Sequence, residues 1–194
     1  MATGREELGF GLILFIPFVY YLNAPKPVAK KLYLMRHAEA GAKESRQDDR
    51  ARELNAAGIK ESRHMGAWFE EERTHFDLIV SSSALRAEQT AHLVAEGMNL
   101  EHPRILLDDS LYESSVRQLL GYINSIEDGY DNVLIVGHNP SISYIAEYLT
   151  KAEIGDMVPA GVTIIKFDLG SWKMVSENTG TLEKYVMPHD IVKY

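Results

Sequence analysis

The chain has 194 residues, no cysteine and a formal net charge of −8 at pH 7. Its hydrophobic share of 45% and charged share of 25% exclude a largely disordered or fibrous chain. The lack of cysteine excludes disulfides, thiolate metal sites and a cysteine nucleophile. The acidic balance argues against general nucleic-acid binding, which needs a basic surface, but it permits a small local pocket for one phosphate.

An uncharged apolar run, Leu8–Leu22, stands apart near the N-terminus. It is shorter than the roughly 20 residues of a comfortable bilayer span, and basic residues follow it, so a short anchor would keep the rest of the chain cytoplasmic. A signal peptide without a clear cleavage site and a packed extension are the alternatives. Pro25 and Pro27 suggest a stiff linker. We therefore expect a hydrophobic extension over 1–27 and one domain over 28–194.

The first half of the domain alternates apolar runs with helical patterns. Lys31–Arg36 is a short apolar run that ends in charge and predicts a buried strand. The polar stretch 41–52 predicts a loop, and Asn55 is a good N-cap for the helix that follows it. Asp77–Ser81 predicts a second strand, and Ala84–Glu96 a helix with one apolar stripe.

The alternation continues in the second half. Ile105–Leu107 predicts a short strand, and Ser114 is placed to cap the next helix. Val133–Val136 predicts a further buried strand, and a helix is expected after Pro140.

The last apolar runs predict a closing hairpin. Val162–Phe167 and Trp172–Val175 flank a Leu-Gly-Ser turn. Together with the strand-helix alternation, this pattern predicts an α/β fold, a three-layer α/β/α sandwich with a mainly parallel central sheet. In such sheets the binding crevice lies beyond the carboxyl ends of the strands.

Residues suited to phosphate chemistry follow the predicted strands. They are Arg36 and His37 after the first strand, Ser82 and then Arg86 after the second, Tyr112 and Glu113 after the third, and His138 after the fourth. The planar fork of arginine suits phosphate oxygens, and a histidine can attack phosphorus as a nucleophile. A second histidine can stabilise developing charge, and a carboxylate can supply a proton to the leaving group.

Four stretches of the sequence resemble motifs of the histidine phosphatase superfamily. Leu-Met-Arg-His-Ala-Glu at 34–39 resembles its Arg-His-Gly signature, with Ala38 in the glycine position. The stretch 81–90 resembles its Ser-x-Ala-x-Arg-Ala-x-Gln-Thr motif, and Gly-His-Asn-Pro at 137–140 matches the small SixA-type branch. Arg52 and the residues up to Gly58 fit that branch's Arg-x-Leu-x-x-x-Gly stretch. The resemblance implies a phosphoglycerate mutase-like fold.

The resemblance also implies a role for each matching residue. His37 is implied to be the nucleophile that becomes phosphorylated, and the phosphate pocket is implied to consist of Arg36, Arg86 and His138. Glu113 is the candidate for the general acid. Glu39 is a second candidate, which we interpret as a solvated loop carboxylate. Neither a metal nor another cofactor is implied.

The implied activity is a metal-independent phosphatase acting on phosphohistidine of a signalling or carrier protein. The alternatives are a phosphomonoesterase acting on a small or envelope-associated phosphate ester, and a non-catalytic phosphate-binding module. The alanine at position 38 and the absence of a Gly-x-Ser after the histidine disfavour a sugar-phosphate mutase. We expect a cytoplasmic, monomeric protein that Leu8–Leu22 can associate with a membrane.

Overall fold

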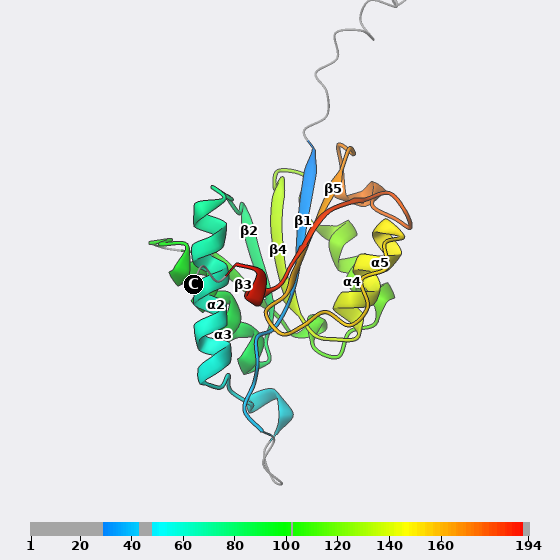
Figure 1. The fold of residues 1–194 in the computed structure, drawn as a ribbon. Coiled ribbons are helices and arrows are strands. Elements are labelled where there is room, and N and C mark those ends of the chain that lie inside the picture. The colour runs from blue at the N-terminus through cyan, green and yellow to red at the C-terminus, as the bar shows by residue number, and fades with distance from the viewer. Residues whose placement is uncertain (1–28, 43–47, 102, 192–194) are drawn as a thin grey trace, which may run out of the picture.

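The computed structural model describes residues 29–42, 48–101 and 103–191. The apolar run Leu8–Leu22 and the predicted domain boundary lie outside these residues. In the order of Figure 1, the strands are β1 (Lys30–Arg36), β2 (Leu78–Ser82), β3 (Ile105–Asp108), β4 (Asn132–Gly137), β5 (Val162–Phe167) and β6 (Thr181–Val186). The helices are α2 (Ala56–Glu71), α3 (Leu85–Gly97), α4 (Val116–Ser125) and α5 (Ser141–Thr150).

The strands form one sheet in the order β3-β2-β4-β1-β5-β6. The four strands β3, β2, β4 and β1 run parallel, whereas β5 and β6 are antiparallel additions at one side. Helices α2 and α3 cover one face of the sheet, and α4 and α5 cover the other (Figure 1). This architecture confirms the predicted three-layer α/β/α sandwich with a mainly parallel sheet.

Both faces of the central strands are apolar because each face lies under helices. In β1, Leu32 and Leu34 belong to one buried cluster, and Tyr33 and Met35 to the other. Successive side chains of a strand point to opposite faces, so an uninterrupted apolar run fills two cores at once. The sheet is thereby fixed in the middle of the molecule, and the carboxyl ends of β1, β2 and β4 are held at one edge.

The predicted closing hairpin was wrong in its second strand. Trp172–Met174 forms a 3₁₀ helix, and the partner of β5 is β6. Trp172 is fully buried against Phe167, and its indole Nε1 donates to the carbonyl of Tyr130 at 2.7 Å. The free energy gained by burying this large side chain in the core exceeds what the segment would gain by pairing as a strand.

The predicted cap of α4 was wrong by one residue. Ser115 is the N-cap, and it forms a capping box with Gln118. A serine followed three residues later by glutamine is the usual signature of such a box. The hydroxyl of Ser114 instead donates to the carbonyl of Leu111 within the preceding loop.

Within the described residues, no helix has both the length and the apolar character that crossing a membrane requires.

Candidate active site

The four residues predicted for the phosphate pocket come together at the carboxyl edge of the sheet. Arg36 ends β1 and His37 follows it, while His138 follows β4 and Arg86 lies in the first turn of α3. The Nε of Arg86 donates to Nε2 of His37 at 3.2 Å. The rings of His37 and His138 have centroids 5.0 Å apart. The sequence prediction that these residues share one site is therefore supported by their geometry.

The hydrogen bonds of His37 assign its tautomer. Nδ1 lies 2.7 Å from the carbonyl oxygen of Ala38, and a carbonyl only accepts, so Nδ1 carries the proton. The other nitrogen, Nε2, then holds a lone pair, in agreement with its acceptance of the Arg86 hydrogen bond. The nitrogen with the lone pair is the one that faces the arginine.

The environment of His37 keeps its ring neutral. Burial lowers the pKa of His37 to about 4, and the neighbouring charges of Arg86, Arg36 and Arg52 act in the same direction. A neutral imidazole is the nucleophilic form. The site therefore presents an available lone pair at neutral pH.

His138 contacts a hydroxyl group where His37 contacts a carbonyl group. Its Nε2 lies 2.9 Å from the hydroxyl of Ser82, a fully buried residue. That hydroxyl oxygen also accepts from the backbone N–H of Ala84, which leaves one lone pair and one proton for the contact with Nε2. We consider the case in which the hydroxyl donates its proton to Nε2. The proton of His138 then sits on Nδ1. Burial first and the nearby His37 second lower the pKa of His138 to about 3, so its ring is neutral.

Several buried side-chain nitrogens in and near the site make no hydrogen bond to the described residues, although Nε of Arg52 lies 3.5 Å from a carboxylate oxygen of Asp49. Among the described residues, the buried side-chain nitrogens that lack a hydrogen-bond partner are Nε of Arg36, Nε of Arg50, Nε of Arg52 and Nδ1 of His138. Arg36 is further fixed by donation from its NH1 to the carbonyl of Met157 at 2.6 Å. Unpartnered buried donors cost free energy, and an oxyanion bound among them would satisfy them.

Sequence reasoning missed Asp49. Its carboxylate Oδ2 accepts from NH2 of Arg86 at 2.9 Å, and its backbone carbonyl accepts from NH1 at 2.6 Å. Arg86 is only 5% exposed, so its guanidinium needs such a partner. Burial would raise the pKa of the Asp49 carboxyl, but Arg86 and Arg52 outweigh that effect and hold it below its usual value.

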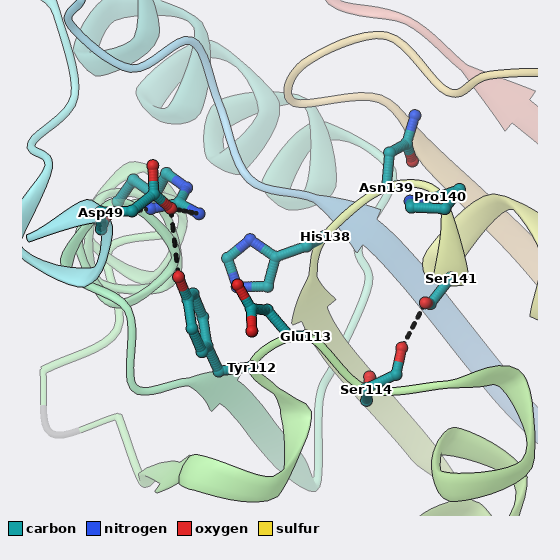
Figure 2. Close-up of a pocket in the computed structure, with 9 residues that line it drawn as sticks. Asp49, Tyr112, Glu113, Ser114, His138, Asn139, Pro140 and Ser141 are labelled. Atoms are coloured by element: carbon teal, nitrogen blue, oxygen red, sulfur yellow. Dashed lines mark hydrogen bonds and ion pairs between the residues drawn. The ribbon is translucent and has the colours of Figure 1, made fainter. Parts of the chain in front are cut away.

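Glu113 lines the same pocket. The cavity has a volume of about 320 Å³ and also includes Arg86, Tyr112, His138 and Pro140 in its wall. Figure 2 shows the Glu113 carboxylate beside the His138 ring. Glu113 has a backbone φ of +50°, a conformation that non-glycine residues adopt rarely and often at functional sites. Glu113 therefore shares a cavity wall with Arg86 and His138.

Glu39 belongs to a different environment. Its carboxylate accepts from the side-chain amide of Asn55 at 2.8 Å, and its carbonyl accepts from the backbone N–H of Asn55 at 3.0 Å. These contacts tie it to the start of α2, and it does not line the cavity beside His138. Its contacts therefore favour Glu113 over Glu39 as the acid candidate.

The described residues offer no cluster of side chains suited to metal binding. Within the described ranges, no group of three or more His, Asp or Glu side chains is placed to hold a metal ion. The charged groups around His37 are arginines, which attract an anion directly.

Comparison with known proteins relates the chain to a family of phosphatases. Residues 32–122 match the family described as the histidine phosphatase superfamily (branch 1). Phosphohistidine phosphatase SixA of Escherichia coli strain K12 is 27% identical over 151 residues, which cover 74% of this chain and 92% of that protein.

Solved structures share the fold. A protein histidine phosphatase SixA complexed with tungstate superposes with a TM-score of 0.71 at 24% identity, over 84% of this chain and 99% of that one. A mycobacterial glucosyl-3-phosphoglycerate phosphatase superposes with a TM-score of 0.60 at 16% identity, over 80% of this chain and 97% of that one.

Proposed function

Since this chain belongs to the histidine phosphatase superfamily (branch 1) and resembles the SixA hydrolases, we propose that it is a metal-independent phosphatase acting through a phosphorylated His37. Its proposed substrate is phosphohistidine on a signalling or carrier protein. Support for the substrate comes from the similarity to SixA, and support for the mechanism comes from the site itself.

In the first step, the lone pair on Nε2 of His37 forms a bond to phosphorus. The bond from phosphorus to the leaving nitrogen or oxygen breaks, and its electron pair stays with the leaving atom, which takes up a proton. Arg36, Arg86 and His138 donate hydrogen bonds to the phosphoryl oxygens, where negative charge is concentrated. Arg86 already contacts Nε2 of His37, so it is placed to guide the phosphoryl group to that atom.

In the second step, water attacks the phosphorus of phospho-His37. The bond between phosphorus and Nε2 breaks, the pair returns to Nε2, and the proton lost by water goes to a base such as Glu113 or to solvent. The hydrogen bond from Nδ1 to the Ala38 carbonyl keeps the ring in one orientation through both steps.

One observation carries this proposal: a neutral imidazole lone pair lies among buried donors that make no hydrogen bond within the described part of the chain. A protein that only bound phosphate would need the donors but not the nucleophile.

The test uses the full-length chain, a histidine-phosphorylated carrier protein labelled with ³²P, and a chelator. Wild type should release phosphate and carry a transient acid-labile label, whereas His37→Ala should do neither. His92→Ala, an exposed change on α3, is the matched control and should behave as wild type. Label on another residue, or undiminished turnover by His37→Ala, would contradict the mechanism.

Hydrolysis of phosphate esters is the second candidate, favoured by the position of Glu113. An ester expels an alkoxide, which needs a proton from a positioned acid. Turnover of alkyl phosphates, with no action on phosphohistidine, would support this alternative. Binding of phosphate without turnover of either substrate would favour the non-catalytic module.

A further inference from the structure

Tyr112 forms an aromatic wall of the cavity and has no part in the steps described above. Its hydroxyl donates to Oδ2 of Asp49 at 3.2 Å, and the guanidinium of Arg50 lies over its ring, 4.6 Å from the centroid. Its ring meets that of His138 edge-on, with centroids 5.5 Å apart and planes at 89°. Three contacts therefore fix the position of the ring before a substrate binds.

Pro140 lies across the cavity from this wall. Figure 2 shows Tyr112 on one side of His138 and Glu113, and Pro140 on the other. The adjoining Ser141 is tied by a hydrogen bond to the carbonyl of Ser114. Both walls are thus held in place, and a group that enters the cavity beside His138 has the tyrosine ring on one side and the proline on the other.

We propose that Tyr112 is a specificity-determining residue that favours planar, unsaturated leaving groups, the imidazole of phosphohistidine in particular, over leaving groups without a ring. Aromatic rings attract one another in stacked or edge-on arrangements. When the departing imidazole is protonated, its positive charge adds a cation–π attraction to the tyrosine. This inference rests on the proposed function and names a residue that sets its substrate class.

The test compares two donors that share a phosphorus–nitrogen bond. Phosphoimidazole has a ring as leaving group, and phosphoramidate has only ammonia. The measured quantity is the single-turnover rate of His37 phosphorylation by each donor, expressed as a ratio, so that the second step and general damage to the site cancel.

Tyr112→Leu should lower the phosphoimidazole-to-phosphoramidate ratio about fivefold, as expected for the loss of one aromatic contact. Tyr112→Met provides a second ring-free side chain of similar size, and thermal unfolding checks that each variant is folded. Tyr112→Phe keeps the ring, so it should retain the wild-type ratio even if both rates fall through the lost bond to Asp49.

An unchanged ratio in the folded Leu and Met variants would overturn this inference. A ratio that falls equally in Tyr112→Phe would also overturn it, because the effect would then come from the hydroxyl and Asp49. Failure of the proposed function is a separate result, since wild type itself would then form no phospho-His37 from either donor.

Discussion

The two histidines of the site have different hydrogen-bond partners, a backbone carbonyl for His37 and a hydroxyl for His138. The Ala38 carbonyl leaves Nε2 of His37 as an acceptor. When the Ser82 hydroxyl donates to Nε2 of His138, Nδ1 of that ring is a donor. One neutral ring can therefore attack phosphorus while the other, equally neutral, donates to an oxygen. Neither role requires an imidazolium.

The low pKa values of these histidines make stability depend on pH. In the folded protein the pKa of His37 is about 4 and that of His138 about 3, whereas an unfolded histidine titrates near 6.5. Between these values the unfolded chain binds more protons, so the free energy of unfolding should decrease as pH falls from about 6.5 to 4. Urea unfolding at several pH values measures this slope.

Replacing one of the two histidines measures its contribution to the pH dependence of the free energy of unfolding. His138→Gln should reduce the slope between pH 6 and pH 4 by about 1 kcal/mol per pH unit, because one fewer group takes up a proton on unfolding. An identical slope in wild type and variant would show that His138 titrates alike in the folded and unfolded chain.

Glu113 should matter more for esters than for phosphohistidine. Glu113→Gln is expected to slow His37 phosphorylation by an alkyl phosphate ~10²–10⁴-fold, because an alkoxide needs a proton as it leaves. Phosphohistidine should be affected much less, because the imidazole ring takes up protons near neutral pH by itself. Single-turnover rates with both substrates test this, with the exposed Glu127→Gln as control. Equal losses would indicate a role in pocket geometry.

The sequence predicts the site residues that follow strands but not Asp49. Arg36, His37 and His138 stand at the ends of apolar runs, where the topology of a parallel sheet gathers side chains. Asp49 lies in a polar loop without periodicity, and it meets Arg86 across 37 positions of the chain. Only the folded structure brings such a pair together.

Gly58 lies in the first turn of α2, and its lack of a side chain lets this helix approach the loop after β1 closely. A Cβ atom at this position would lie 2.2 Å from the carbonyl oxygen of Glu39, which is backbone and has little room to move. Gly58→Ala should therefore destabilise the protein by about 1–3 kcal/mol, the usual effect of overpacking.

Gly121 is the matched control, since it lies in α4 with nothing within 4 Å of its added Cβ. Gly121→Ala should stabilise the protein by about 0.5–1 kcal/mol, because alanine loses less backbone freedom in a helix. Chemical denaturation measures both. Equal effects of the two substitutions would refute the steric explanation for Gly58.

Periodicity located the parallel strands well but failed after β5. Buried strands in the sheet centre have unmistakable apolar runs, as in Val133–Val136. The final strand β6 is an edge strand with mostly exposed side chains, so it shows no such run. The sequence pattern instead predicts a strand at the apolar residues around Trp172, which form a 3₁₀ helix in the structure.

The apolar run Leu8–Leu22 leads to a testable expectation about membrane association of the full chain. If Leu8–Leu22 anchors the protein, the full chain should sediment with membranes and resist a salt wash. A form beginning at Val28 should stay in the supernatant with unchanged phosphatase activity. Sedimentation assays of both forms measure this, and full-length protein found only in the supernatant would contradict an anchor.

The contact between Asp49 and Arg86 has a consequence for how the enzyme handles its product. The guanidinium of Arg86 already has an internal counter-anion, so under the proposed mechanism phosphate would bind there by exchange rather than by simple addition. The carboxylate competes for Arg86 again once hydrolysis is complete. This return of the internal partner opposes retention of inorganic phosphate and favours rapid release of the product.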